Sequence, residues 1–398
     1  MRDTHDVQPA NHRMMVARAI TLAVALALTG CSTLTGFLGD DEDEPAAPAE
    51  LESFEPETDI RTLWSRRVAS GEGGQQLDLR AVLDGGRLFA AGHDGDVAAY
   101  DPFTGEPLWE AETGLSLSGG PGAGSGLVVV GDSGGGVVAL SGADGAVAWR
   151  AQLTSEVLSA PAVGERIVAV RTVDGKLHGL DTASGARIWV YDRTVPALSL
   201  RGTSAPVIAG EVVIAGFDSG HLAAVSLADG QLRWEFQVAA PTGQTELERL
   251  ADIDADPVVS DGAVYAVAFQ GQVAAFELRT GRPLWQRDMS SHAGMGVGGR
   301  LIYVTDEESR VWAFDRRTGA SLWRQDGLAH RGVTRPVEFG DYVVVADFEG
   351  YVHWLSSDDG RFAARARAGG AVLAPPVTGS TAVYVLDGSG KLTSLAGS

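Results

Sequence analysis

Residues 175–189 read GKLHGLDTASGARIW, and this stretch holds the pattern that decides the fold. Asp181 opens a turn that closes at Gly185, and Trp189 stands four residues after that glycine. An Asp side chain can accept hydrogen bonds from the turn backbone, and Gly can adopt a positive φ. The strand that follows the turn then carries the tryptophan.

The same spacing recurs along the chain with a period of roughly 40 residues. The tryptophans that follow a glycine by four residues are Trp109, Trp149, Trp189, Trp234, Trp285 and Trp323. A seventh unit passes through Gly360 but has Ala364 in place of the tryptophan. Each unit divides into four short strands, and the second of them is rich in β-branched residues, as in residues 166–170. Because sheets of this kind bury both faces only when they pack radially, the repeat predicts a β-propeller with its tryptophans between blades.

The two ends of the chain fix the number of blades. The last unit, through residues 390–396, stops without a fourth strand, whereas residues 60–64 are a fourth strand without a blade. Seven complete units and this divided one predict an all-β, eight-bladed β-propeller over residues 60–398, closed in its last blade by the N-terminal strand. Such closure leaves no open sheet edge between the last blade and the first.

The N-terminal residues are typical of a secreted lipoprotein. An apolar run over residues 19–28 precedes Cys31, the single cysteine of the chain. The run is too short for a stable transmembrane helix and fits the apolar region of a signal peptide. The segment resembles the bacterial lipoprotein signal, which implies that residues 1–30 are removed and Cys31 is lipidated. By the same resemblance, Ser32 after the cysteine implies delivery to the outer membrane.

An acidic stretch separates the cysteine from the repeats. Residues 32–59 contain ten acidic residues, no basic residue and three prolines. A like-charged, Pro-containing segment cannot bury a core. We therefore expect residues 31–59 to form a flexible tether between the lipid and the propeller.

The overall composition excludes several classes of function. The chain has 31 Lys and Arg against 52 Asp and Glu, a formal charge of −21, which disfavours binding to nucleic acid. A single cysteine excludes a disulfide framework and Cys-ligated metal centres, and the eight histidines lack the spacing of metal ligands. We therefore expect no metal, no cofactor and no catalytic residues.

Two insertions interrupt the repeat on either side of the fourth blade. From Trp149 to Trp189 the spacing is 40 residues, but the next two spacings, up to Trp234 and up to Trp285, are 45 and 51. Both insertions connect the fourth strand of one blade to the first strand of the next. Because such connections emerge on one face of the ring, the two insertions should be neighbours in space.

The content of the insertions favours a protein-binding patch. The first contains Leu198, Leu200 and Arg201, and the second contains Asp252 and Asp254. Leucines beside an arginine and acids on a surface loop suit a partner interface. The alternative is that the leucines fold back and that Arg201 merely pairs with Asp252 or Asp254.

These features together resemble a known family. The repeat resembles the PQQ-like repeat, and with the lipoprotein signal and the two insertions it resembles the BamB family of the outer-membrane β-barrel assembly machinery (BAM). Residues 348–354 and 359–362 are similar to the seventh blade of that family. The family's partner-binding residues fall on Leu198, Leu200, Arg201, Asp252 and Asp254.

The resemblance implies a non-catalytic scaffold on the periplasmic face of the outer membrane, monomeric outside its complex. It would bind a POTRA domain of BamA and assist the folding and insertion of outer-membrane proteins. Two other classes remain open on the sequence: a PQQ-dependent quinoprotein oxidoreductase, and an envelope scaffold with a different partner. Resemblance to the quinoprotein dehydrogenases would imply a longer chain with a pair of adjacent cysteines over the cofactor. This chain has only Cys31.

Overall fold

The structure, a computed structural model, describes residues 46–68, 71, 77–196, 204–240 and 251–397 of the 398-residue chain. Contacts divide the chain into residues 1–47 and a second compact unit that begins at Pro48, and the fold below is that of the second unit. The described residues form 33 β-strands and no helix. None of the described chain therefore forms a helix long and apolar enough to span a membrane.

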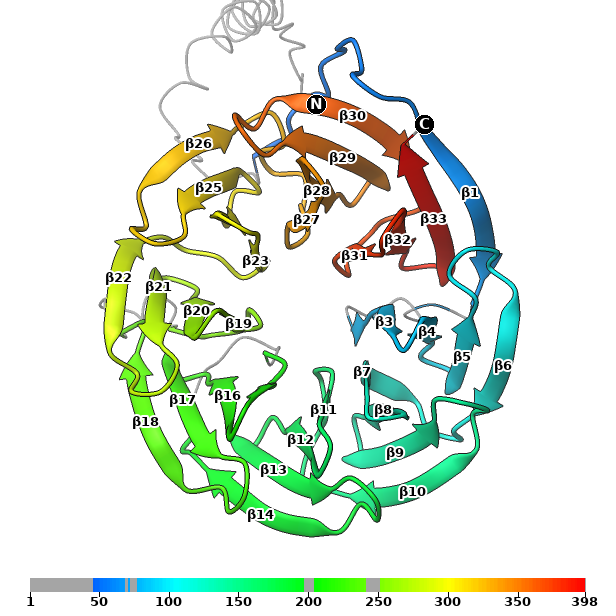
Figure 1. Cartoon of the computed structure of the whole chain (residues 1–398), viewed down its shortest axis with the longest axis vertical. Coiled ribbons are helices and arrows are strands. Elements are labelled where there is room, and N and C mark those ends of the chain that lie inside the picture. Colours follow the sequence, from blue (N-terminus) through cyan, green and yellow to red (C-terminus); the bar gives the residue numbers. More distant parts are fainter. Residues whose placement is uncertain (1–45, 69–70, 72–76, 197–203, 241–250, 398) are drawn as a thin grey trace, which may run out of the picture. The chain divides into compact units, whose positions relative to one another are not determined.

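The second unit is an eight-bladed propeller, as predicted (Figure 1). Six sheets are built from four consecutive strands each, a seventh has four consecutive strands and one added strand, and the eighth joins the two ends of the chain. In that sheet β1 (Ile60–Arg67) pairs antiparallel with β33 (Lys391–Gly397), with Trp64 opposite Ser394. The predicted closure by the N-terminal strand is confirmed.

Each blade runs from an inner strand at the central channel to an outer strand at the rim (Figure 1). The strands of blades 1 to 4 are β3 (Val82–Asp84), β4 (Arg87–Ala91), β5 (Asp96–Tyr100) and β6 (Pro107–Glu112); β7 (Leu117–Gly124), β8 (Leu127–Asp132), β9 (Gly136–Ser141) and β10 (Val147–Gln152); β11 (Ala162–Val163), β12 (Ile167–Arg171), β13 (Lys176–Asp181) and β14 (Arg187–Asp192); β15 (Val207–Ala209), β16 (Val212–Gly216), β17 (His221–Ser226) and β18 (Leu232–Gln237). The strands of blades 5 to 8 are β19 (Val258–Ser260), β20 (Ala263–Val267), β21 (Gln272–Glu277) and β22 (Pro283–Asp288); β23 (Gly294–Val297), β24 (Leu301–Thr305), β25 (Val311–Asp315) and β26 (Ser321–Gln325); β27 (Val337–Phe339), β28 (Tyr342–Ala346), β29 (Tyr351–Ser356) and β30 (Phe362–Arg367); β31 (Val377–Thr378), β32 (Val383–Leu386), β33 and β1. One further short strand, β2 (Asp78–Leu79), pairs parallel with β7 inside blade 2.

The core lies between blades, where the middle strands bury both faces. Every residue of β12 and β20 is buried, and their side chains are apolar except for Tyr265 and for Arg171, which ends β12 in a buried ion pair. The turn before the outer strand has the predicted chemistry: the amide of Ser184 donates to Oδ1 of Asp181 at 2.9 Å, and Gly185 has a φ of 71°. The buried layers therefore follow the repeat, and the turns set the strand register.

Seven of the eight seams between blades are closed by a tryptophan, in an arrangement that we call the tryptophan lock. In the lock between blades 3 and 4, the indole N–H of Trp189 donates to the carbonyl of Leu227 at 2.9 Å. Its ring lies against Gly230, where a Cβ would approach the ring to 2.7 Å. The seven locks use Trp64, Trp109, Trp149, Trp189, Trp234, Trp285 and Trp323.

The seam between blades 7 and 8 has no tryptophan lock. Blade 8 takes its outer strand from the other end of the chain, so it lacks the glycine turn on which a tryptophan would dock. Blade 7 has Ala364 on its outer strand, and the large side chain is instead Trp354, directly opposite on β29 and 1% exposed. In the other blades the residue opposite the tryptophan is small, for example Ala224 opposite Trp234. In blade 7 the tryptophan and the small residue opposite it have therefore exchanged strands.

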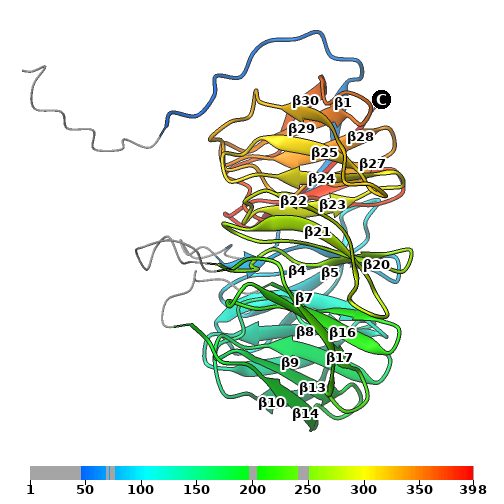
Figure 2. The same cartoon turned by 90° about the vertical axis from the view of Figure 1, so that its left-hand side faces the viewer.

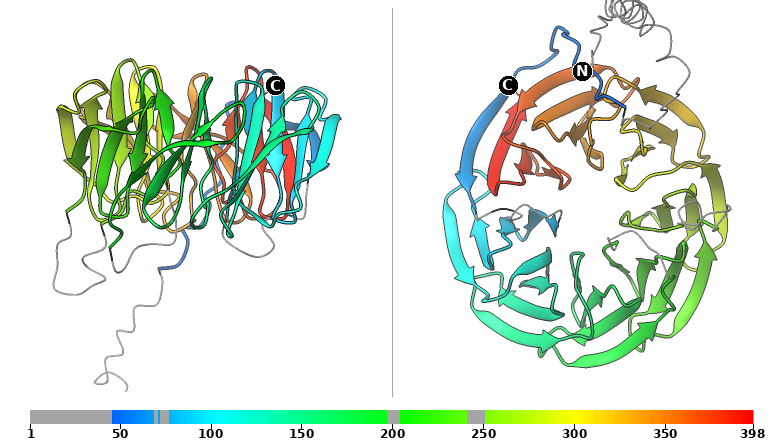
Figure 3. Two further views of the ribbon diagram at one scale, coloured as in Figure 1. Left: turned by 90° about the horizontal axis from the view of Figure 1, so that it is seen from below. Right: turned by 180° about the vertical axis from the view of Figure 1, so that it is seen from behind.

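The ring has two distinct faces (Figures 2 and 3). Because the strands of a blade alternate in direction, the connections from an outer strand to the next inner strand all lie on one face. We call it the connection face. Both insertions, between β14 and β15 and between β18 and β19, belong to it. The turns before the outer strands lie on the opposite face.

Residues 48–59 lie against the propeller, although the sequence predicted them as part of a flexible tether. The amide of Ala49 donates to the carbonyl of Ala329 at 2.9 Å, and that of Glu57 donates to the carbonyl of Ala363 at 2.8 Å. Leu51 packs against the core between blades 6 and 7. The acidic composition of this stretch concealed two apolar side chains, Leu51 and Phe54, that have partners on the ring.

Candidate functional site

The second insertion ends in an extended segment with an acid at every second position. Ala251 and Ile253 are buried in the hydrophobic cluster between blades 4 and 5, and Ala255 in the one between blades 5 and 6. The alternate positions are therefore directed away from those clusters, because side chains of an extended chain alternate in direction. They are occupied by Asp252, Asp254 and Asp256.

Of the predicted site residues, the structure describes two. Asp252 and Asp254 fall within the described chain, whereas Leu198, Leu200, Arg201 and the predicted lipidation site Cys31 lie outside it. The predicted proximity of the two insertions at those residues stays a prediction.

Asp252 fixes the path of the segment across blade 5. Its carbonyl accepts the amide of Phe269 at 2.8 Å, which forms an isolated bridge with the chain after β20. Its side chain is only 1% exposed. Ile253 closes against Gly216, where a Cβ would lie 2.4 Å from the isoleucine side chain. The backbone that presents the next acid is thus held from two sides.

Asp254 lies beside a buried ion pair. Arg171, fully buried, pairs with Asp218, donates to the carbonyl of Gly216 and lies 4.7 Å from the ring centre of Phe217. Burial and the charge of Asp218 raise the pKa of Asp254 to about 6, against the opposing charge of Arg171. Within the described residues, Oδ1 of Asp254 has no hydrogen-bond partner. This oxygen is itself buried, which agrees with burial as the main cause of the raised pKa of Asp254.

Asp254 also lines a cavity at the mouth of the central channel. The cavity has a volume of about 440 Å³ and is walled by connections from several blades, including His292, Val333 and Leu373. Leu373 is 42% exposed there. Arg80, Asp256 and Arg335 also line this first cavity. The same three residues line a second cavity of about 580 Å³, whose other walls are the inner strands of the blades. These three side chains therefore divide the channel.

The residues that divide the channel form a linked set of ion pairs. Arg80 donates to Asp256 at 2.7 Å and to Asp78 at 2.9 Å, and Arg335 donates to Asp256 at 3.2 Å. Asp256 also accepts the amide of Ala205 at 2.7 Å, so blades 2, 4, 5 and 7 are joined at the axis. Although burial acts the other way, Arg80 and Arg335 hold the pKa of Asp256 below its usual value. The axis is thus filled by the chain's own charges.

Sequence reasoning did not identify this axial cluster. Arg80, Asp256 and Arg335 occur in different repeats without a common spacing. Among the described residues, no group of three His, Cys, Asp or Glu side chains is arranged to hold a metal ion.

Fold and site together define the class of protein: an eight-bladed propeller with PQQ-like repeats and an acidic insertion on its connection face. Comparison with known proteins gives the family. A family profile described as outer membrane protein assembly factor BamB matches residues 50–114, 93–325 and 314–398. The chain belongs to the BamB family, and is accordingly not an enzyme.

Individual relatives agree with this assignment. The chain is 41% identical to outer membrane protein assembly factor BamB of Xanthomonas campestris over 94% of its own length and 96% of that protein's. It is 47% identical to BamB of Pseudomonas aeruginosa over 94% of its length and 97% of that protein's. The crystal structure of BamB from Moraxella catarrhalis superposes with a TM-score of 0.77 at 29% identity, covering 85% of this chain and 99% of that one.

Proposed function

We propose that the protein is a non-catalytic outer-membrane protein assembly factor of the BAM complex. Lipidated at Cys31, it faces the periplasm and binds a POTRA domain of BamA through its connection face. Leu198, Leu200 and Arg201 supply one side of this interface, and Asp252 and Asp254 supply the other. The observation that carries the proposal is the segment 251–256, which belongs to the connection face and places Asp254 in the lining of the cavity there.

The side chains of the proposed interface differ in the contacts that they can make. The planar guanidinium of Arg201 makes directed hydrogen bonds while its stem packs, which is why arginine is frequent at binding hot spots. Leu198 and Leu200 add apolar contact. The two acids either orient Arg201 or meet a base on the partner. Substitutions in the first insertion should leave the propeller unchanged, because that insertion is an addition to the repeat. Asp252 is 1% exposed and bridged to Phe269, so its substitution also needs a check of folding.

Binding to purified BamA POTRA domains tests the proposal. Arg201→Ala and Leu200→Ala should each weaken binding by about 1–4 kcal/mol without lowering the unfolding midpoint. Glu156→Arg, on another connection of the same face, is the matched control and should bind like the parent. If Arg201→Glu binds as tightly as the parent while folded, the interface lies elsewhere, and a crosslinking pull-down from outer membranes would identify a different partner.

A double-mutant cycle separates the two roles of the acids. If Asp252 orients Arg201, the effects of Arg201→Ala and Asp252→Ala on the binding free energy will be strongly non-additive. If each residue meets its own group on BamA, the two effects will nearly add. The control is the pair Arg201→Ala and Glu156→Arg, which should be additive in either case.

The lipid anchor is tested by fractionation of cells. One acyl chain binds a membrane weakly, whereas several together anchor a protein stably. Cys31→Ser should therefore move the protein from the membrane fraction to the soluble periplasm in cells whose BamA lacks the docking domain. A variant that stays with the membrane there would contradict lipidation at Cys31.

A further inference from the structure

Residues 48–57, which we call the strap, pass along blades 6 and 7 before the chain enters β1 (Figure 1). The first end of the strap lies on the connection face. There the carbonyl of Ala49 accepts from Nη1 of Arg331 at 2.9 Å, while its amide donates to Ala329 in the connection between β26 and β27. Arg331 is only 3% exposed, so the strap is bonded to a side chain rooted in the ring.

The middle of the strap is held by aromatic and cationic contacts. Phe54 stacks on Phe362 of β30 with ring centres 5.5 Å apart and planes 20° apart. The guanidinium of Arg365 lies 5.0 Å from the centres of both rings. Arg365 also donates to the carbonyl of Glu52 at 3.0 Å. One arginine thus holds both the backbone and the aromatic side chain of the strap.

The last part of the strap adds to the edge of blade 7. The amide of Glu57 donates to the carbonyl of Ala363 on the outer strand β30. Its carboxylate accepts from Nε of Arg361 at 2.8 Å. Backbone pairing at an open strand edge combined with side-chain pockets is a general mode of peptide recognition.

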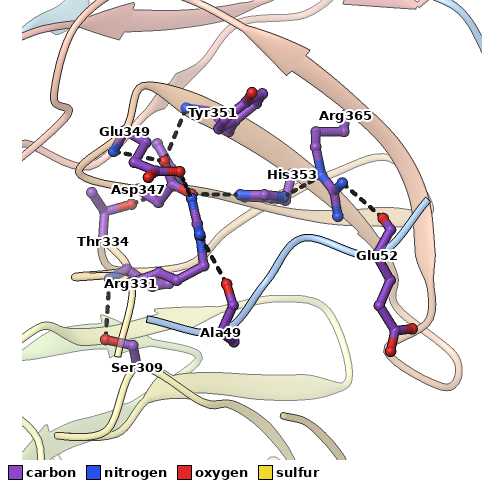
Figure 4. A network of polar contacts seen from close by, with 12 residues as sticks. Ala49, Glu52, Ser309, Arg331, Thr334, Asp347, Glu349, Tyr351, His353 and Arg365 are labelled. Atoms are coloured by element: carbon purple, nitrogen blue, oxygen red, sulfur yellow. Dashed lines mark hydrogen bonds and ion pairs between the residues drawn. The ribbon is translucent and has the colours of Figure 1, made fainter. Parts of the chain in front are cut away.

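A buried polar network supports the two arginines from beneath (Figure 4). Arg331 donates to Asp347 at 2.8 Å, and Arg365 donates to Nδ1 of His353 at 3.1 Å. Because arginine has no acceptor, Nδ1 of His353 is unprotonated and Nε2 carries the hydrogen. Nε2 then donates to Asp347 at 3.2 Å. His353 and Asp347 are completely buried, so both arginines are held in place independently of the strap.

We propose that blade 7 carries a binding site for an extended peptide, that the chain fills it with its own residues 48–57, and that this strap ties the outer strand of blade 8 to blade 7. Three observations agree. The seam between blades 7 and 8 lacks the tryptophan lock of the other seven, and its apolar packing comes from Trp354 and its neighbours. The strap is bonded to blades 6 and 7 and continues directly into β1, the outer strand of blade 8. Its contacts include apolar stacking, ion pairing and backbone hydrogen bonds at three separate points.

The strap also fixes the position of residue 48, the first residue of the propeller unit. Docking at Ala329 places residue 48 on the connection face, the face that carries both insertions. A chain extends at most about 3.6 Å per residue, so release of the ten strap residues would lengthen the tether by up to roughly 35 Å. This consequence for a membrane-bound protein rests on the proposed lipid anchor, whereas the docking of the strap does not.

Amide hydrogen exchange on the full-length chain carrying Cys31→Ser tests the docking without membrane or BamA. The amides of Ala49 and Glu57 should exchange at least about tenfold more slowly than in a free peptide of residues 46–59. Arg361→Glu and Glu57→Arg should each remove the protection at Glu57, and the two together should restore it. Glu55→Arg, an equal change of charge at an exposed strap position, is the matched control and should keep the protection.

The same variants test the role of the strap at the seam. Phe54→Ala should lower the denaturant midpoint of unfolding and speed cleavage of the strap by a glutamate-specific protease, whereas Glu55→Arg should alter only the cleavage site at residue 55. Exchange of Ala49 and Glu57 in the parent at the rate of the free peptide would overturn the proposal. So would a charge-swapped double variant that exchanges as fast as the single variants. A failure of BamA binding would leave these results unaffected.

Discussion

Neighbouring blades are joined by a tryptophan lock at seven seams of the ring and by other contacts at the eighth, between blades 7 and 8. At the seven, a tryptophan from one blade bonds to a turn of the next, with Nε1 to carbonyl distances of 2.8 to 3.1 Å. At the eighth, no turn is available, because the outer strand of blade 8 comes from the N-terminal end. The chain just before that strand crosses blade 7 instead. A repeat can therefore close a ring everywhere except where the chain itself is interrupted, and there a non-repeated segment is needed.

The largest test of this comparison removes both the strap and β1. A chain beginning at Ala69 loses Trp64, which is 7% exposed, and leaves the edge of β33 open. Loss of a buried tryptophan alone costs about 3–5 kcal/mol, a large part of the stability of a domain. We expect the truncated chain to aggregate or to unfold without a cooperative transition, as measured by size-exclusion chromatography and denaturant titration. A truncated chain that unfolds like the parent would refute the eight-bladed closure.

The next test asks whether the seven locks are equivalent. Trp234→Ala should lower the free energy of unfolding by about 3–5 kcal/mol, because it leaves a cavity between blades 4 and 5 and an unpaired carbonyl at Leu278. Trp234→Phe should cost less, since it keeps most of the apolar contact and loses the hydrogen bond. Trp149 and Trp285, at other seams, should give similar values. A lock that tolerates alanine would show that its seam is closed by other contacts.

A smaller effect is expected from reversing the exchange in blade 7. The double variant Trp354→Ala with Ala364→Trp restores the order of residues seen in the other blades. Blade 8 has no glycine turn to receive the ring, so we expect a loss of about 1–3 kcal/mol from misplaced volume rather than a gain. Denaturant unfolding measures it, with Trp354→Ala alone as the reference. A more stable double variant would mean that blade 8 can accept a tryptophan lock.

Much of this fold could be predicted from the sequence because the same residue pattern occurs in almost every blade. The glycine turn, the tryptophan and the strand spacing predicted the blades, and the unpaired ends at residues 60–64 and 390–396 predicted the closure. The exception at Ala364 was visible too, but not its compensation by Trp354, because pairing across strands depends on register. The strap occurs only once, and its acidic residues masked the contacts of Phe54. Single events of this kind leave no periodic signal.

The candidate site was less predictable for the same reason. Asp252 and Asp254 stood out because they lie in an insertion that breaks the repeat. The partners that determine the properties of Asp254, namely Arg171 and Asp218, come from blades 3 and 4. Arg80 and Arg335 meet Asp256 at the channel axis from blades far apart in the sequence. A propeller brings such residues together only at its centre, so their contacts follow from the closed ring and not from local spacing.

The smallest expected effect is a difference in pH dependence between the contacts of the strap and the tryptophan locks. The tryptophan locks use an indole N–H and a carbonyl, which do not titrate, whereas the network beneath the strap contains His353. Burial lowers the pKa of His353 below its usual value, although Asp347 acts in the opposite direction. The folded protein therefore binds fewer protons at this site than the unfolded chain, so its contribution to stability is present above about pH 6.5 and is lost as the pH falls. Protonation at Nδ1 would also remove the acceptor used by Arg365, which holds Glu52 of the strap.

After correction for intrinsic exchange rates, we expect protection of the Ala49 and Glu57 amides to decrease between pH 7 and pH 5, while protection of Gly230 in a tryptophan-locked turn stays constant. His353→Gln should abolish the difference in pH dependence, and equal loss of protection at both places would show that acid weakens the whole ring rather than the docking of the strap.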